Sequence, residues 1–284
     1  MILVIGGRSK IGSAVIDELL AGGLRVRALA RDGESAGFPD VVEAVAGDLA
    51  DPGSLAAAMD GVDRVFLLCG PREDEVDLNR NAIDAAERAD VGLLVRSSIL
   101  GASPDSPSSF IRDHGVCDAY LRDTNLKHAI VHPNLFAQNV RENTIPSIGE
   151  DGTFYANAGQ ARISMVDTRD VGAVAAVLLT EPGHEGDEVD VTGPEALSYA
   201  DVADKVSAAL GREITYVDAP DDAVRQALSG FGLGEWMVSS LIELFQDYRR
   251  SGEDGYASRV TEAVERITGR VPRTLDQLLE EEAR

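Results

Sequence analysis

The stretch MILVIGGRSKIG, residues 1–12, runs from an apolar pentamer directly into a glycine turn. An amphipathic segment, 11–20, follows the turn and ends just before a second pair of glycines. A buried strand, a tight turn and a helix N-terminus in this order form an anion site, because the positive end of the helix faces the turn. Gly6, Ser9 and Gly12 give an incomplete G-x-x-G-x-x-G pattern, in which Ser9 stands at the middle glycine position. The pattern predicts a pyrophosphate site, and the alternative is a glycine-rich turn that binds no ligand.

The charge of the chain argues against a nucleic-acid partner. Its 284 residues include 49 acidic and 26 basic side chains, a formal net charge of −23, without a cluster of Lys or Arg. Such a surface repels a phosphate backbone. We expect no secretory leader, no membrane-spanning segment, and reduced thiols at Cys69 and Cys117. These expectations together describe a cytoplasmic protein.

Strand-like and helix-like segments alternate over residues 1–135. The expected strands are 1–5, 24–30, 41–46, 64–68, 92–97 and 127–131, and the expected helices are 11–20, 52–59, 73–89 and 110–124. Strands rich in Val, Ile and Leu that alternate with helices form parallel sheets with right-handed crossovers. The pattern predicts an α/β fold, a Rossmann-type doubly wound parallel sheet, with residues 1–135 as its dinucleotide-binding core.

The pattern loosens after residue 135. We expect a short strand at 162–166, a helix at 167–180, a strand at 188–191, a helix at 198–210 and a strand at 213–217. Residues 219–284 have mostly helical periodicity. Residues 136–284 are therefore predicted to form a small, mostly helical lobe on the substrate side, with interleaved elements that complete the sheet.

Arginines near the ends of the first two strands indicate which dinucleotide is bound. An acidic residue after the second strand would accept the ribose 2′-hydroxyl of NAD, whereas arginine accommodates a 2′-phosphate. Arg31 occupies this position, and Arg8 in the glycine turn adds a second guanidinium. We therefore predict NADP(H) as the cofactor. Two alternatives remain: Asp32 could contact the ribose instead, and Arg31 could be a solvated loop residue.

Two further loops at the same sheet edge are candidates for cofactor contacts. Asp48 and Leu49 follow the third strand, where a carboxylate suits the adenine amine and leucine suits the ring face, although Asp48 could equally be a turn residue. Cys69-Gly70-Pro71 closes the fourth strand. Gly70 would let the backbone pass close to the cofactor, and Cys69 is expected to be a wall residue, since no general base stands beside it.

In combination these motifs resemble the NmrA-like branch of the atypical short-chain dehydrogenase/reductases. The matching segments are Val4–Gly12, Arg31, Gly47–Leu49, Ser97-Ser98, Gly101-Ala102, His114 with Asp118 and Leu121, His132–Phe136 with Asn139, Ile163–Val171, Val191–Glu195 and Thr268–Thr274. The family includes NADPH-dependent quinone oxidoreductases and redox-sensing regulators, so the resemblance implies an NAD(P)-binding fold. The chain departs from the family pattern at Ser9, and at His132, where an arginine before proline is common.

The usual proton donor of the wider superfamily, a Tyr-x-x-x-Lys pair, is absent from this sequence. The resemblance places His114 at the nicotinamide ribose, where an imidazole could hold a hydroxyl or donate a proton near neutral pH. Asp118, one helical turn later, could orient it, and the alternative is a solvated pair on the helix surface. Ser97 and Ser98 lie at the carboxyl edge of the sheet, where either a ligand contact or a strand-end cap is expected.

The expected site residues follow from these segments. The catalytic candidates are His114 and Ser98. The candidate cofactor contacts are Gly6, Arg8, Ser9, Lys10, Ile11, Gly12, Arg31, Asp48, Leu49, Cys69, Gly70, Pro71, Ser97, His114 and Pro133. The candidate substrate contacts are Phe136, Asn139, Met165 and Trp236, each of which could also be core packing. No His, Cys or acidic spacing supports a metal site.

The function expected first is NADPH-dependent transfer of hydride to a small, electron-poor acceptor of the quinone or enone type. A reduced quinone can take its protons from water, which is compatible with the missing Tyr-x-x-x-Lys pair. The alternatives are a non-catalytic NADP(H)-binding redox sensor, and a secondary-metabolism tailoring reductase or isomerase. The expected partner is a small-molecule substrate, and a homodimer remains open.

Overall fold

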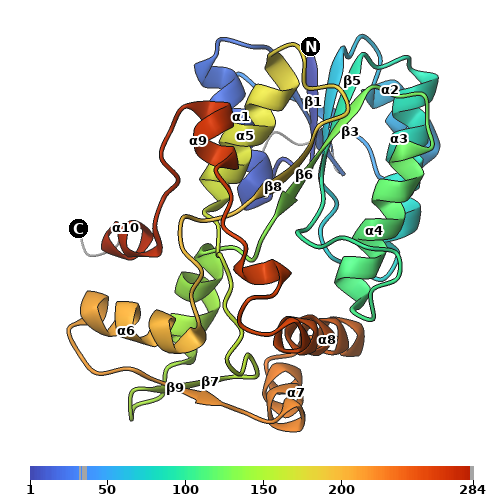
Figure 1. Cartoon of the computed structure of the whole chain (residues 1–284). Helices are drawn as coiled ribbons and strands as arrows, with labels where there is room; N and C mark the ends of the chain where they lie inside the picture. The colour runs from blue at the N-terminus through green and yellow to red at the C-terminus, as the bar shows by residue number, and fades with distance from the viewer. Residues whose placement is uncertain (32, 34–36, 282–284) are drawn as a thin grey trace.

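A parallel β-sheet forms the centre of the molecule (Figure 1). The computed structural model describes residues 1–31, 33 and 37–281, and within them the sheet has seven strands in the order β3-β2-β1-β4-β5-β6-β8. The strands are β1 (Ile2–Ile5), β2 (Val26–Ala30), β3 (Glu43–Ala46), β4 (Arg64–Leu67), β5 (Leu93–Ser97), β6 (His128–Pro133) and β8 (Glu188–Val191). The order reverses between β1 and β4. In open sheets of this kind, ligands bind at the carboxyl ends of the strands beside that reversal.

Helices cover both faces of the sheet, as apolar parallel strands require. One face carries α1 (Lys10–Ala21), α5 (Thr168–Thr180) and α9 (Ala263–Thr268), and the other carries α2 (Pro52–Ala58), α3 (Glu75–Arg88) and α4 (Ser109–Arg122) (Figure 1). The Rossmann-type class predicted from the sequence is confirmed. The predicted strands and helices of residues 1–135 are all present, with ends that differ by at most two residues.

A second, mostly helical lobe lies beyond the carboxyl edge of the sheet (Figure 1). It contains α6 (Tyr199–Leu210), α7 (Asp221–Gly230), α8 (Glu235–Ser251) and α10 (Leu275–Glu280), the short helices η1 (Val140–Thr144), η2 (Ile145–Ser147) and η3 (Tyr256–Ser258), and a separate pair of parallel strands. These strands are β7 (Thr153–Ala156), which the sequence did not predict, and β9 (Thr215–Asp218). An apolar cluster that includes Phe154, Tyr199 and Tyr248 holds this lobe together.

The strand predicted at 162–166 is wrong. Ile163 and Val166 each form only a single bridge, with Leu197 and Phe136 respectively. The backbone of Ser164 is used elsewhere: its N–H donates to the carbonyl of Ala257, and its carbonyl accepts from the N–H of Gly193. A segment bonded to two unrelated loops has no continuous partner strand, so the alternating pattern does not become a ladder.

The two lobes are interleaved along the chain. The segments α5, β8 and α9 all come after residue 135, yet they pack on the sheet (Figure 1). Strand β8 pairs with β6 from Ile130 opposite Glu188 to Pro133 opposite Val191, and it forms one edge of the sheet. The division of the chain at residue 135 stays a prediction.

Candidate functional site

The glycine turn between β1 and α1 has the backbone geometry of an anion site. Gly6 has a φ of +82°, and a Cβ there would lie 2.5 Å from the carbonyl oxygen of Leu68. Ser9 caps α1, because its Oγ accepts the N–H of Gly12 at 3.0 Å. Ser9 has an ordinary extended φ of −77°, so this position does not require glycine. The first helical N–H groups, of Lys10 and Ile11, lie at the positive end of the helix, where a phosphate is favoured.

Gly12 keeps α1 close to the turn. A Cβ on Gly12 would stand 2.2 Å from the carbonyl oxygen of Gly6. The helix therefore approaches β1 more closely than any other residue type allows. The side chain of Lys10, also a predicted contact, forms an ion pair with Glu142 of η1.

The two arginines predicted to meet a 2′-phosphate lie near the ends of β1 and β2. The Arg8 guanidinium lies over the ring of Phe38, 5.2 Å from its centroid. Arg31 follows β2 with its side chain 74% exposed, and its Nε lies 3.3 Å from Oδ2 of Asp48. The other oxygen of Asp48 accepts the N–H of Ala50 at 2.9 Å, as in a turn. Asp32, the residue that could favour NAD, lies outside the described residues.

The loop after β4 contributes a small opening beside the turn. A Cβ built on Gly70 meets no atom within 4 Å, so the backbone there faces open space. Pro71 is exposed, Leu49 is half-buried, and Cys69 is 7% exposed. Burial raises the pKa of the Cys69 thiol to about 12. A thiol with this pKa is not a nucleophile at neutral pH, and the place of Cys69 in the wall of a cofactor site stays a prediction.

A cluster of charged side chains is buried behind the carboxyl ends of β5 and β6. We call it the Arg96 cluster; its members are Glu75, Asn79, Arg96, Ser98, His114, Asp118 and His132. Arg96 is fully buried in β5. Its Nε donates to Oδ1 of Asn79 at 3.1 Å, its Nη1 donates to Asp118, and its Nη2 lies 2.9 Å from Nδ1 of His114. All three nitrogens of the guanidinium are thus engaged by buried partners.

The Arg96 contact determines the form of His114. A guanidinium can only donate, so Nδ1 of His114 accepts, and the ring proton is on Nε2. Burial, together with the charge of Arg96, lowers the pKa of His114 to about 3. His114 is therefore a neutral imidazole near neutral pH. The prediction that it could act as an ordinary acid near neutral pH is not supported by this environment, whereas holding a hydroxyl through Nε2–H is compatible with it.

Asp118 is the centre of the cluster and does not form the solvated pair with His114 that the sequence left open. It is fully buried. One of its oxygens accepts from Arg96, and the other accepts from Oγ of Ser98 at 2.7 Å and from Nε2 of His132 at 3.2 Å. Burial opposes its ionisation, but the His132 hydrogen bond and the Arg96 charge hold the pKa of Asp118 below its usual range. Asp118 and His114 are connected through Arg96, which contacts both.

His132 connects the cluster to the β8 edge of the sheet. Its Nδ1 lies 3.5 Å from Oδ1 of Asp190, opposite the Asp118 contact. Burial alone would lower the pKa of His132, but the two carboxylates outweigh it and raise the pKa to about 9. His132 is therefore an imidazolium at neutral pH. A cation at this position replaces the arginine that is common in the family pattern.

The remaining predicted residues lie around the carboxyl edge of the sheet. Ser97 and Ser98 are both 5% exposed. Pro133 is buried, and its carbonyl oxygen accepts a hydrogen bond from the N–H of Leu100. Among the predicted substrate contacts, Phe136 and Asn139 are half-buried after β6, and Met165 is 5% exposed within the second lobe. Trp236 packs edge-on against Phe110, with 5.6 Å between the two ring centroids. The functions of these side chains at the site stay predictions.

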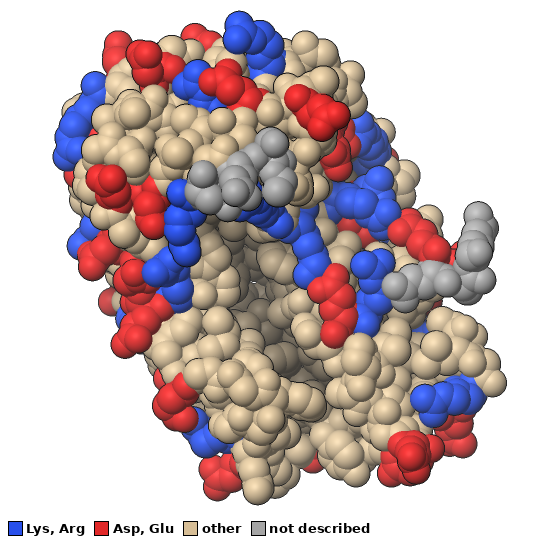
Figure 2. All heavy atoms as spheres, turned by 180° about the vertical axis from the view of Figure 1, so that it is seen from behind, with Lys and Arg blue, Asp and Glu red and all other residues tan. Residues whose placement is uncertain are grey.

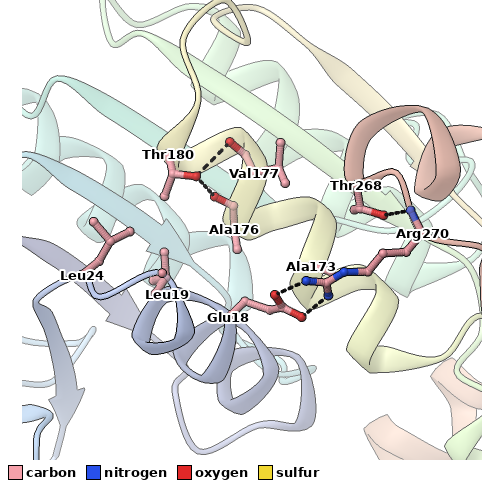
Figure 3. A pocket seen from close by; sticks show the side chains of 10 residues that line it. Glu18, Leu19, Leu24, Ala173, Ala176, Val177, Thr180, Thr268 and Arg270 are labelled. Carbon is pink, nitrogen blue, oxygen red and sulfur yellow. Dashed lines mark hydrogen bonds and ion pairs between the residues drawn. The ribbon is translucent and has the colours of Figure 1, made fainter.

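A hollow separates the two lobes on the face seen in Figure 2. Lys and Arg side chains gather on its upper rim, next to the sheet, and mostly uncharged side chains lie below it. Two cavities lie elsewhere. One of 130 Å³ lies between the C-terminal part of α1 and α5, near the ion pair of Glu18 with Arg270 (Figure 3). Another, of 680 Å³, lies along β8 beside His132 and Asp190.

Sequence reasoning missed Glu75, Asn79 and Arg96. One signal was available: Arg96 interrupts the apolar run Leu93–Val95 within a strand expected to be buried on both faces. A charge at such a position needs buried partners. Glu75 and Asn79 gave no comparable signal, because acidic and amide residues near a helix start are ordinary surface residues.

Within the described residues, no group of three or more His, Cys, Asp or Glu side chains could hold a metal ion. No helix among them is long and apolar enough to cross a membrane. Both cysteines are free and buried.

Comparison with known proteins identifies the family. A family model described as NAD(P)H-binding matches residues 6–182. The chain is 38% identical over 276 residues to an NAD(P)H azoreductase of Xenophilus azovorans, covering 96% of this chain and 95% of that protein. Among solved structures, the NADPH-dependent quinone oxidoreductase QOR2 of Escherichia coli in complex with NADPH superimposes with a TM-score of 0.88 at 22% identity, covering 100% of both chains. The regulator NmrA in complex with NAD superimposes with a TM-score of 0.77 at 19% identity, covering 99% of this chain and 97% of that chain. The chain belongs to the NAD(P)H-binding family and has the NmrA-like fold.

Proposed function

We propose that this protein is a reductase that uses NADPH to reduce a small, electron-poor acceptor such as a quinone, an enone or an azo compound. The observation that supports it most is the 38% identity to an azoreductase over 96% of the chain. Fold likeness alone would not support an activity, since the same fold also occurs in a regulator. A quinone acceptor agrees with the absence of a Tyr-x-x-x-Lys pair, because a reduced quinone can take its protons from water.

The residues present fit a dinucleotide. The turn of Gly6 and the N-terminus of α1 would hold the pyrophosphate, and the open space at Gly70 would let the cofactor pass along the sheet edge. Arg8 and Arg31 would meet a 2′-phosphate, with Arg31 exchanging its contact with Asp48 for the phosphate. A basic rim on a protein of net charge −23 supports the same assignment (Figure 2). We therefore favour NADP(H) over NAD(H).

When bound, the nicotinamide supplies a hydride. The protein has to position the acceptor and to let one proton reach the atom on which negative charge develops. His114 presents an Nε2–H donor, which suits an acceptor oxygen or nitrogen on which negative charge develops. Ser98 is fixed by Asp118 and Phe136 lies after β6, so both stay candidate contacts near this point. The free, buried thiols agree with a reducing compartment, and we place the protein in the cytoplasm.

The proposal is tested by following NADPH absorbance with a panel of quinones, enones and azo dyes, alongside calorimetry with NADPH and NADH. Turnover of at least one acceptor class and tighter binding of NADPH are expected. Replacing Arg31 with glutamate should reverse the cofactor preference. Binding of NADPH without turnover of any acceptor would contradict the reductase and favour the redox sensor instead.

A further inference from the structure

The carboxyl group of Glu75 is buried behind His114 and is incompletely satisfied. Glu75 is the first residue of α3 and is 1% exposed. Within the described part of the chain, its Oε1 has no hydrogen-bond partner. This oxygen lies 3.2 Å from Nδ1 of His114 and 3.9 Å from Nη2 of Arg96. Buried polar atoms without a partner are rare in native proteins, so this oxygen calls for an explanation.

The surroundings of Glu75 keep a proton on its carboxyl group. Burial raises the pKa of Glu75 to about 8, and Arg96 offsets this only in part. The titratable and charged groups that act on Glu75 or border it come from β5, from α4 and from the loop after β4; they are Arg96, Asp113, His114, Cys117, Asp118 and Cys69. Near neutral pH, a protonated carboxyl group therefore lies 3.2 Å from the unprotonated nitrogen of His114.

We propose that Glu75 is a positioning residue behind His114, and that its carboxyl group returns the proton which His114 gives to the reduced acceptor. The inference rests on the proposed reductase function. Nδ1 of His114 points into the cluster, so Nε2 is the ring nitrogen on the opposite side, and the side chain keeps 14% exposure. The Glu75–His114 pair would thus supply the proton that a Tyr-x-x-x-Lys pair supplies elsewhere.

The step balances in protons and electrons. The two electrons reach the acceptor with the hydride, and the acceptor lone pair that results takes the proton of His114 Nε2. Nδ1 takes the proton of Glu75 as Nε2 releases its own, so the imidazole stays neutral throughout. Nδ1 then no longer accepts from Arg96, and Nη2 of Arg96, which lies 3.9 Å from Oε1 of Glu75, turns its hydrogen to the carboxylate left there. A proton from solvent restores the carboxyl group before the next turnover.

Two acceptors separate proton supply from structural damage. An azo dye needs a hydride and a proton, whereas a triarylmethane cation needs only the hydride, because its product is neutral. Glu75→Gln keeps the size of the side chain and removes the acidic proton. We expect this variant to lower kcat for the azo dye at least tenfold with little change in KM, and to leave kcat for the triarylmethane cation within twofold.

Wild-type kcat for the azo dye should fall above pH 8, and this fall should be absent in the variant. Glu73→Gln, an exposed carboxylate in the loop before α3, is the matched control and should behave as wild type.

A second measurement does not depend on turnover. The ¹⁵N shifts of the His114 ring in the cofactor-free protein should report Nδ1 unprotonated and Nε2 protonated, and should change near pH 8 as Glu75 ionises. Glu75→Gln should abolish that change. Equal slowing of both acceptors, no slowing of either, or His114 shifts that ignore pH between 6 and 9 would overturn the inference. If the wild type reduces no quinone, enone or azo dye, the proposed function fails, and the ¹⁵N titration alone then decides whether Glu75 is coupled to His114. The same titration decides the question if the wild type reduces a quinone or an enone but not the azo dye.

Discussion

Removing the charge of His132 should cost stability in a pH-dependent way. His132 lies between the carboxylates of Asp118 and Asp190, at 3.2 and 3.5 Å, and its pKa rises from 6.5 to about 9. At about 1.4 kcal/mol per pH unit, this rise corresponds to about 3 kcal/mol of folding free energy. Because the folded protein holds this proton more tightly, the contribution is fully present below pH 6.5 and is lost as pH rises through 9.

The variant His132→Gln keeps a side-chain donor toward Asp118 and removes the charge. Urea denaturation at pH 6, 7.5 and 10, at one protein concentration, gives the free energy of unfolding of each protein. We expect wild type to exceed the variant by about 3 kcal/mol at pH 6, and the difference to shrink to about 1 kcal/mol or less at pH 10. Glu75 titrates in the same range but is present in both proteins, so its contribution cancels in the difference.

His184→Gln is the control. Nδ1 of His184 lies 2.8 Å from Oδ2 of Asp187, in an ion pair that is far more exposed. Its loss should change stability by about 0.5 kcal/mol or less. If the difference between wild type and His132→Gln stays constant from pH 6 to 10, His132 is not an imidazolium between two carboxylates, and the charge assignment of the cluster is refuted.

Three further outcomes are expected from the turn and the thiols. Gly12→Ala places a carbon 2.2 Å from the carbonyl of Gly6 and should cost about 1–3 kcal/mol, seen as a lower Tm and weaker NADPH binding; an unchanged Tm would contradict the close approach. Gly70→Ala enters open space and should leave Tm unchanged while weakening NADPH binding in calorimetry, and unaltered affinity would remove Gly70 from the cofactor site. Because burial raises the pKa of Cys69 to about 12 and of Cys117 to about 11, neither thiol should react with a disulfide reagent at pH 8 until urea unfolds the chain. Rapid labelling of the native protein would count against that burial.

The sheet and its helices could be predicted because each is specified by neighbouring residues. The apolar pentamer, Gly6 and the cap at Ser9 lie within a single stretch, so pattern and structure agree there to within a residue. Strand β7 was missed for the opposite reason. It has only four residues, Thr153–Ala156, and its partner β9 lies about sixty residues away, so no local periodicity marks it.

The Arg96 cluster could not be predicted from the sequence alone. Glu75, Arg96 and Asp118 are each charged residues that composition assigns to the surface, and the fold brings them together from α3, β5 and α4. Their pKa values depend on burial and on one another, and neither is visible in a linear pattern. The expected place of His114 at the nicotinamide ribose stays a prediction, and the sequence could not reveal the guanidinium that sets its tautomer.

The elements β8, α5 and α9 follow residue 135 in the chain but pack on the sheet, and this connectivity limits which parts of the chain can be removed or exchanged. A fragment that stopped at residue 135 would leave β6 as a bare edge and expose the apolar side of α1, and unprotected edges of this kind recruit other chains. The part of the chain after residue 135 cannot be exchanged as a unit, since its loss also removes β8, α5 and α9 from the sheet. We therefore expect changes in acceptor specificity to arise from substitutions in the loops that line the hollow, because these leave the connectivity of the chain unchanged.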